Sequence, residues 1–276
     1  MKEKTSFRVP TVLSIAGFDG SAGAGIQADN KTIGSLGCYA VNVLSALPIQ
    51  NSQGVKSVFA LPPAIFQQQL ITIFEDCYPD VIKIGMLYQA DDVAFLAEFL
   101  QDYRGKVVMD PVMISSSGHR LMEENCLMCV KQDLFPLVDL LTPNLPEISY
   151  LLGETVKELA DMERISSVAL NLGAKAVLLK GGHLDSDVLS SMLIQKGKDV
   201  KIFETERIES RNTHGTGCTL SSAIASYLAL GEDLETACEK GIFYTHQAIA
   251  AAVDLEIGKG NGPLNHAFDP KKLIKI

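Results

Sequence analysis

One stretch of the sequence, residues 212–219, combines residue types that could hold an anion and activate a nucleophile beside it. It reads Asn-Thr-His-Gly-Thr-Gly-Cys-Thr and leads into an apolar run, residues 220–230, that predicts a buried helix ended by Gly231. A glycine turn that opens a helix exposes unpaired backbone N–H groups and the positive end of the helix dipole, which favour phosphate. The same dipole favours a thiolate at Cys218. The alternative is a glycine-rich turn before a core helix with an inert cysteine.

Other polar side chains are predicted to gather at one edge of a sheet. They follow short apolar strands, and the carboxyl ends of parallel strands are where open α/β sheets bind ligands. They are Asp19, Gln50 with Asn51, Asp110, Asn144 with Glu147, and Lys180. Each one alone could be an ordinary turn former or helix-capping residue. Together with the glycine turn they suit a nucleoside triphosphate with Mg²⁺.

Strands and helices alternate along the chain, which predicts one α/β domain: three layers around a mostly parallel sheet. The expected strands are residues 11–16, 40–47, 55–60, 81–84, 106–109, 137–141 and 176–180, with a hairpin of 188–194 and 200–203 and an extended piece at Ile208. The expected helices run from the loop 17–25 to about residue 36 and over 62–74, 91–103, 123–134, 148–152, 156–172 and 234–253. No repeat or linker divides residues 1–276.

Composition narrows the class of protein. The 276 residues are 47% hydrophobic and carry a net charge of −9, with no cluster of lysine and arginine. We therefore expect no nucleic-acid or membrane partner, and the charged N-terminus lacks the apolar core of a signal peptide. Six scattered cysteines are typical of a cytoplasmic protein, and the pair Cys126 and Cys129 is interpreted as structural, within the helix at 123–134.

The motifs resemble those of the ribokinase-like small-molecule kinases, and among them the hydroxymethylpyrimidine/phosphomethylpyrimidine kinases of thiamine biosynthesis. The matching segments span almost the whole chain: 14–29, 50–55, 83–87, 110–113, 142–147, 180–183 and 212–219. The resemblance implies an ATP- and Mg²⁺-dependent kinase of the ribokinase-like fold. It would phosphorylate 4-amino-5-hydroxymethyl-2-methylpyrimidine and then the monophosphate, and relatives are often homodimers.

The resemblance also implies roles for residues. The backbone from Gly215 through Thr216 and Gly217 to Cys218 would form an anion hole, and Cys218 would be the general base. Lys180 would be a catalytic contact to the phosphates. The nucleotide and metal would be held by Asp110, Asn144 and Glu147, with Glu147 and Asp110 nearest Mg²⁺. The pyrimidine pocket would be lined by Gln50, Asp29, Gly17, Met86 and Val112.

Chemistry supports two of these roles. A thiol ionises more readily than an alcohol, and the helix N-terminus is expected to lower the pKa of Cys218 further. The amide of Gln50 matches an aminopyrimidine edge, which presents an amino donor beside a ring-nitrogen acceptor. The sequence departs from the usual family pattern at Phe18 and Gly20, which leaves the closure of the first loop open. Residues 115–120 receive no role, and His183 and His214 are interpreted as structural.

Several alternatives stay open from the sequence alone. Pyridoxal kinase is one, because its substrate is also a small heteroaromatic ring with a hydroxymethyl arm, although Gln50 favours the pyrimidine. A vitamin-precursor-binding protein without activity is another, yet the glycine turn and Cys218 are both intact. A dinucleotide-dependent oxidoreductase is disfavoured because the first loop has the order G-x-x-G-x-G rather than G-x-G-x-x-G.

Overall fold

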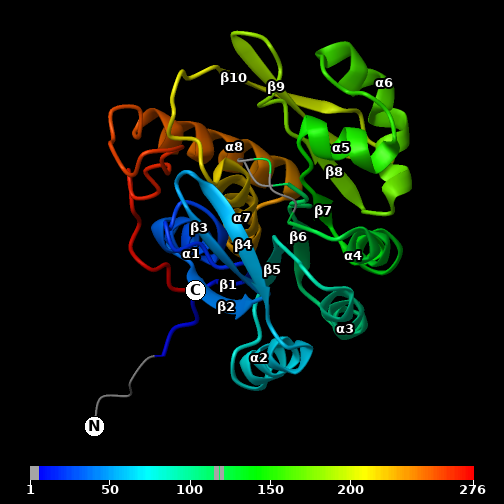
Figure 1. The fold of residues 1–276 in the computed structure, drawn as a ribbon, viewed down its shortest axis with the longest axis vertical. Helices are drawn as coiled ribbons and strands as arrows, with labels where there is room; N and C mark the ends of the chain where they lie inside the picture. Colours follow the sequence, from blue (N-terminus) through cyan, green and yellow to red (C-terminus); the bar gives the residue numbers. More distant parts are fainter. Residues whose placement is uncertain (1–5, 115–117, 119–120) are drawn as a thin grey trace.

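The central feature of the fold is an eight-stranded sheet in the order β10-β9-β8-β7-β6-β5-β1-β2 (Figure 1). The computed structural model describes residues 6–114, 118 and 121–276. Strands β1 (Thr11–Ala16), β2 (Tyr39–Leu44), β5 (Val81–Ile84), β6 (Lys106–Met109), β7 (Leu140–Leu141) and β8 (Ala176–Leu179) are parallel. The hairpin of β9 (Val188–Gln195) and β10 (Lys201–Glu206) is antiparallel at one edge. The predicted α/β class with a mostly parallel sheet is confirmed.

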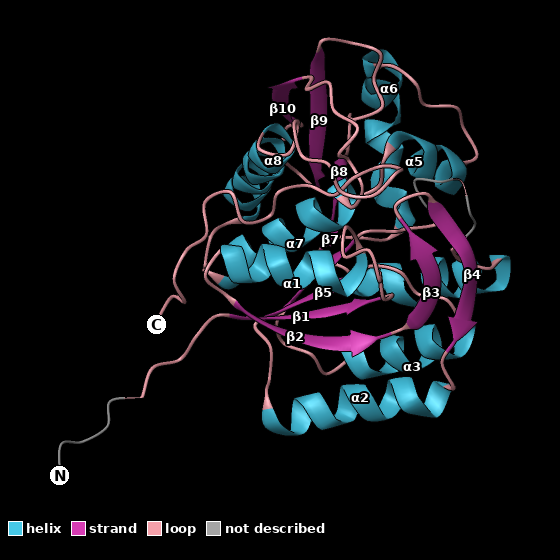
Figure 2. Ribbon diagram, turned by 60° about the vertical axis from the view of Figure 1, so that its left-hand side comes forward, coloured by secondary structure: helices cyan, strands magenta, loops and turns pink. Residues whose placement is uncertain are grey.

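Helices cover both faces of this sheet, so alternate residues along each strand enter different cores. Leu13 and Ile82 face a core with helices α2 (Pro63–Asp76), α3 (Ala90–Leu100), α4 (Glu124–Cys129), α5 (Leu145–Leu152) and α6 (Leu159–Ala169). Val12 and Val81 face the opposite core, with α1 (Gly25–Ser35), α7 (Thr216–Ala229) and α8 (Leu234–Ala250). Figure 2 shows α2 and α3 on one side of β1 and β2, and α1 and α7 on the other. Among the described residues, no helix is long and apolar enough to cross a membrane.

The chain leaves the main sheet after β2 to form a separate hairpin, β3 (Ala46–Asn51) and β4 (Gly54–Ala60). The sequence predicted one strand over 40–47, because that segment is mostly apolar on both sides of Ser45. Ser45 interrupts it: its hydroxyl donates to the Met86 carbonyl at 2.6 Å, and its backbone N–H donates to the Ala16 carbonyl at 3.0 Å. The hairpin therefore rises from the carboxyl end of the sheet (Figure 2).

Other element bounds differ from prediction in detail. The helix expected over 123–134 is α4 continued by a π-helical turn, Val130–Leu134, and it carries buried Cys126 and half-buried Cys129 as free thiols. The strand expected over 137–141 is only β7, because a 3-10 turn at Phe135–Leu137 precedes it. Ile208 lies in a segment without regular structure rather than in an extended strand. Most of residues 115–120, which received no role, lie outside the described residues.

Candidate active site

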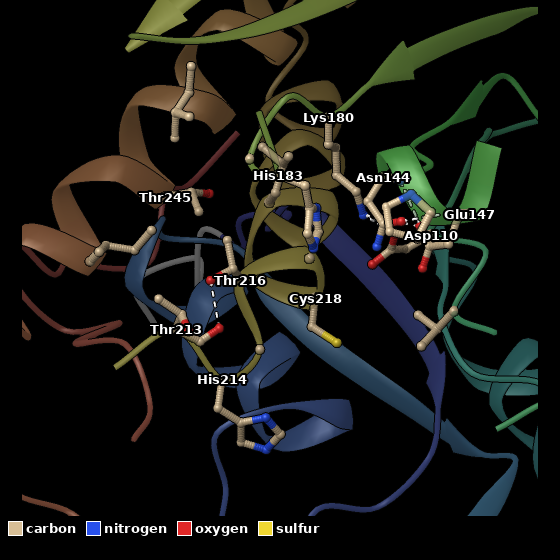
Figure 3. Close-up of a pocket in the computed structure, with 18 of the residues that line it drawn as sticks. Asp110, Asn144, Glu147, Lys180, His183, Thr213, His214, Thr216, Cys218 and Thr245 are labelled. Atoms are coloured by element: carbon tan, nitrogen blue, oxygen red, sulfur yellow. Dashed lines mark hydrogen bonds and ion pairs between the residues drawn. The ribbon is translucent and has the colours of Figure 1, made fainter. Parts of the chain in front are cut away.

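A cavity of about 920 Å³ opens at the carboxyl ends of the parallel strands. Its wall includes nine of the predicted site residues: Asp110, Val112, Asn144, Glu147, Lys180, Gly215, Thr216, Gly217 and Cys218. Figure 3 shows Lys180, Asp110, Asn144 and Glu147 grouped at one side, and Cys218 facing the open space from the start of α7. The structure thus brings together segments that lie far apart in the sequence, as the strand-end pattern predicted.

The glycine turn has the geometry of an anion site. Gly215 precedes α7 with φ of 87°, a left-handed conformation that glycine adopts without strain, and no side chain caps this helix. The N–H of Thr216 donates to the Thr213 carbonyl at 3.3 Å. Within the described part of the chain, the N–H groups of Gly217 and Cys218 have no hydrogen-bond partner. These free donors and the helix dipole favour negative charge.

Both glycines are required by their neighbours, and Gly215 is also required by its left-handed backbone conformation. A Cβ at Gly215 would lie 1.8 Å from the carbonyl oxygen of Gly23, so the two glycine-rich loops pack backbone against backbone. A Cβ at Gly217 would lie 2.7 Å from Oδ2 of Asp110 and 3.3 Å from Nζ of Lys180. The turn therefore approaches the charged side chains closely enough to share one ligand with them.

Lys180, Asp110 and Glu147 form a charged cluster at the cavity wall. Nζ of Lys180 lies 2.6 Å from Oδ1 of Asp110 and 3.8 Å from Oε2 of Glu147. Burial raises the pKa of Glu147 to about 7; Lys180 opposes that rise and Asp110 adds to it. Two carboxylates therefore share one ammonium group, and a further cation would relieve their repulsion.

Asn144 and Glu147 hold each other in place. Oδ1 of Asn144 accepts from the Glu147 N–H at 2.8 Å, and Oε2 of Glu147 accepts from the Asn144 N–H at 2.8 Å. This is a capping box, which fixes the start of α5. The backbone of Asn144 also bridges to that of Lys180, so the ends of β7 and β8 lie side by side. The cap thereby fixes a carboxylate next to the lysine.

Cys218 is half-buried at the first turn of α7. Burial raises the pKa of its thiol to about 11, whereas Lys83 and the N–H of Gly25 act in the opposite direction. The expectation that the helix N-terminus leaves this pKa below its usual value is therefore wrong in net direction. Desolvation outweighs the opposing effects of Lys83 and the Gly25 N–H, so the thiol form is favoured at neutral pH.

Several of the residues expected around a pyrimidine lie at or against the β3–β4 hairpin, and Gln50 belongs to β3. A Cβ at Gly17 would lie 2.9 Å from Sδ of Met86, and Val112 packs against the cluster that contains Met86. Nε2 of Gln50 donates to the Phe18 carbonyl at 3.2 Å. Only Val112 of this set belongs to the cavity wall, while Gly17, Met86 and Gln50 lie outside it.

Asp29 departs from its expected place in a pyrimidine pocket. Its side chain has 0% exposure, and its two oxygens are 2.9 and 2.8 Å from Nζ of Lys83. The hydroxyls of Ser14 and Ser222 also donate to it, at 2.5 and 2.8 Å. The carboxylate is thus fully engaged beneath the site, because α1 turns this face of Gly25–Ser35 toward the sheet. Asp29 is not among the residues that line the 920 Å³ cavity.

Sequence reasoning missed two features of the site. Lys83 has 0% exposure although it lies in an otherwise apolar strand, and a charge inside such a run is the signal that could have revealed it. His214 contacts Asp19 with 2.9 Å between Nε2 and Oδ2. No spacing rule connects residues 195 positions apart, so this contact had no sequence signal. His183, interpreted as structural, lies on the cavity wall.

Comparison with known proteins agrees with this geometry. Residues 19–265 match the phosphomethylpyrimidine kinase family. The chain is 40% identical to the hydroxymethylpyrimidine/phosphomethylpyrimidine kinase of Rhizobium meliloti, over 92% of this chain and 96% of that protein. It is 43% identical to the thiamine biosynthesis bifunctional protein of Geobacter sulfurreducens, over 93% of this chain. The matched part of this chain covers about half of the length of that bifunctional relative, 52%.

Solved structures show the same fold. A phosphomethylpyrimidine kinase from Clostridium difficile is 39% identical with a TM-score of 0.76, over 87% of this chain and 99% of that one. The pyridoxal kinase of Staphylococcus aureus in complex with AMP-PCP and pyridoxal is 29% identical with a TM-score of 0.85, over 94% of each chain. The family match over residues 19–265, the identity to relatives over most of the chain and the shared fold together show that this chain belongs to the phosphomethylpyrimidine kinase family.

Proposed function

We propose that this kinase phosphorylates 4-amino-5-hydroxymethyl-2-methylpyrimidine and then its monophosphate, with ATP as the phosphoryl donor. The observation that carries the proposal is the placement of Cys218. Its side chain and the free N–H groups of the glycine turn face the same cavity as the Lys180, Asp110 and Glu147 cluster (Figure 3). A base, an anion site and a phosphate-binding lysine then surround one reacting phosphoryl group.

The first reaction follows from this arrangement. The hydroxymethyl oxygen attacks the γ-phosphorus, the bond from that phosphorus to the bridging oxygen breaks, and ADP leaves. The hydroxyl proton passes to the sulfur of Cys218, which must be a thiolate to accept it. The N–H groups of Gly217 and Cys218 stabilise the charge on the transferred group. Because the pKa of Cys218 is about 11, only a small fraction of the enzyme has the thiolate at neutral pH.

Nucleotide and metal fit the charged side of the cavity. Lys180 would contact the phosphates, and Asn144 and Thr216 lie on the same wall. Glu147 and Asp110 supply carboxylate oxygens, which are the ligands Mg²⁺ prefers. Across the described residues, no cluster of three or more potential ligand side chains surrounds a single point. Phosphate oxygens and water would therefore complete the shell around Mg²⁺, which would neutralise charge on the phosphates.

The acceptor ring would occupy the space under the β3–β4 hairpin. Met86 packs directly against Gly17, and Val112 packs beside Met86, so these residues would form an apolar wall for a flat ring. Gln50 would offer its amide to the polar edge of the ring. Asp29 is excluded from this list by its buried contacts. Removing the Gln50 amide would leave the amino group of the ring unpaired, which costs about 1–3 kcal/mol in a dry pocket.

Pyridoxal kinase is the second candidate, favoured by the structural similarity to the Staphylococcus aureus enzyme. Purified enzyme is assayed with ATP and Mg²⁺ on the pyrimidine alcohol, its monophosphate and pyridoxal in parallel. We expect kcat/KM to be at least tenfold higher for the pyrimidine alcohol than for pyridoxal. A ratio at or below one would assign the protein to pyridoxal, and the absence of turnover on all three would support a binding protein. A homodimer also stays a prediction, which light scattering after gel filtration would test.

A further inference from the structure

A fully buried ion pair lies beneath the glycine turn. Lys83 comes from β5 and Asp29 from α1, and both side chains have 0% exposure. The ammonium contacts both carboxylate oxygens, and the hydroxyls of Ser14 and Ser222 complete the partners of the carboxylate. Burial would lower the pKa of Lys83, but the opposing effects of Asp29, Cys218 and Asp110 together raise it above its usual value. The lysine is therefore charged.

The buried pair lies next to the helix that carries Cys218, because Ser222 of that helix contacts Asp29. Ser222 is four residues after Cys218 on α7, so the two side chains lie on the same face of that helix. A Cβ at Gly85 would lie 2.9 Å from Nζ of Lys83, which places the ammonium beside the residue that follows β5. The helix α7 packs across β5 and β6 at this point (Figures 1 and 2). The ammonium thus lies between the sheet and the base.

The two partners of the pair are not equivalent. Asp29 has four contacts from three side chains, whereas Lys83 uses its nitrogen on Asp29 alone. Within the described residues, no other acceptor contacts that ammonium group. Of the charges that act on the Cys218 sulfur, Lys83 has the largest effect and favours the thiolate, while Asp29 and Asp110 oppose it. Lys180 also interacts electrostatically with this sulfur.

Stability alone gives little reason for such a pair. Taking two charges out of water costs several kcal/mol per ion, and apolar residues of similar volume often fill such a position with equal or greater stability. The sulfur of Cys218, by contrast, is desolvated and resists ionisation in this structure. A fixed positive charge beneath it would offset that resistance.

We propose that Lys83, held in place by Asp29, is a positioning residue whose ammonium group stabilises the negative charge on Cys218 before it takes the proton of the substrate. This role rests on the proposed function, because it matters to catalysis only if Cys218 is the base. Asp29 then orients the lysine and sets the distance of the positive charge from the sulfur, instead of binding the substrate.

The first test measures the thiol alone, without nucleotide or substrate. The neutral double variant Lys83→Met/Asp29→Asn removes both charges, and Lys83→Gln/Asp29→Asn does so with polar side chains. The rate of Cys218 alkylation by iodoacetamide is followed by mass spectrometry of the Cys218 peptide between pH 7 and 9. Because the rate follows the thiolate fraction, a rise of one unit in the thiol pKa lowers it about tenfold. We expect a decrease of about fivefold or more at every pH.

The matched control is Ser14→Ala, which removes a buried hydrogen bond from Asp29 but leaves both charges. We expect its alkylation rate to stay within twofold of that of the wild type. Thermal unfolding, followed by circular dichroism, shows which double variant is folded. If Lys83→Met/Asp29→Asn is unfolded, Lys83→Gln/Asp29→Asn is used instead. A folded neutral variant whose Cys218 reacts within twofold of wild type would overturn the proposal.

The second test separates this role from a merely structural one. In the folded neutral variant we expect kcat for the pyrimidine alcohol to fall about tenfold, while KM for ATP and for the alcohol stay within about threefold. An increase in KM with unchanged kcat would contradict the role. If Cys218→Ala keeps full activity, the proposed function of Cys218 fails, whereas the alkylation experiment still reports the coupling of Lys83 to the sulfur.

Discussion

Nε2 of His214 lies 2.9 Å from Oδ2 of Asp19, and this contact joins the two glycine-rich loops of the site. The Asp19 carboxylate also accepts from Ser21, Gly23 and Ala24, so it occupies the anion-binding space of its own loop. Burial would raise the pKa of Asp19, but these hydrogen bonds lower it below its usual range. The first glycine loop is therefore organised around an internal carboxylate, and the proposed phosphate site is at the second glycine loop.

Replacing His214 tests this connection. His214→Ala removes the bridge between the loops, so we expect kcat/KM for the pyrimidine alcohol to fall about tenfold or more, which corresponds to about 1.4 kcal/mol. Ser21→Ala is the matched control, because it removes a donor from the same carboxylate within one loop. Steady-state kinetics of both variants make the comparison. Equal losses in the two variants would show that the bridge has no special role.

Gly215 and Gly231 form a matched pair for the backbone requirement. Both have positive φ, 87° and 91°, but a Cβ at Gly215 meets the Gly23 carbonyl at 1.8 Å, whereas nothing lies within 4 Å at Gly231. We expect Gly231→Ala to cost about 1 kcal/mol of unfolding free energy. Gly215→Ala should cost more and lower kcat/KM at least tenfold, because the loops must separate. Urea unfolding measures the unfolding free energy of each variant, and steady-state kinetics measures kcat/KM. Equal losses of unfolding free energy and of kcat/KM in the two variants would contradict the close packing at Gly215.

His266 predicts how stability depends on pH. Its Nε2 lies 3.0 Å from the Thr219 hydroxyl, and burial lowers its pKa from 6.5 to about 4. Between these two values the unfolded chain binds more protons than the folded protein, so stability falls as the pH falls through this window. The share of His266 should be about 2 kcal/mol between pH 7.5 and 5. Urea unfolding at both pH values should show this loss reduced in His266→Gln, and an identical loss in the variant would argue against a buried neutral histidine.

Three residues on the charged side of the cavity could be predicted from the sequence because each follows a strand. Asp110, Asn144 and Lys180 come after continuous apolar runs, and parallel strands bring such positions to one edge. The position of Asp29 within α1 could not be interpreted in the same way, because it does not follow a strand. Asp29 belongs to a family motif near the first loop, yet only the packing of α1 on the sheet shows that it meets Lys83. The end of one strand and the start of the next at Ser45 could also not be predicted, because mostly apolar residues continue past Ser45 into β3.

The pH dependence of catalysis follows from the burial of Cys218. Because its thiol has a pKa of about 11, the thiolate fraction rises about tenfold for each pH unit below that value. We expect kcat for the pyrimidine alcohol to increase nearly tenfold for each pH unit, or nearly a hundredfold from pH 7 to pH 9. In Cys218→Asp, whose carboxyl ionises at lower pH, the profile should be much flatter. A flat profile in the wild-type enzyme would exclude a thiolate as the limiting base.

The comparison of two acceptors tests the role of Cys218 most directly. The hydroxymethyl group must lose a proton as it attacks, whereas the phosphate of the monophosphate, with a second pKa near 6, is already ionised at pH 8. We measure kcat of Cys218→Ala at pH 8 on both substrates at saturating ATP and Mg²⁺. The account predicts a loss of about a hundredfold or more with the alcohol and less than about tenfold with the monophosphate. Wild-type activity on the alcohol, or equal losses with both acceptors, would contradict it.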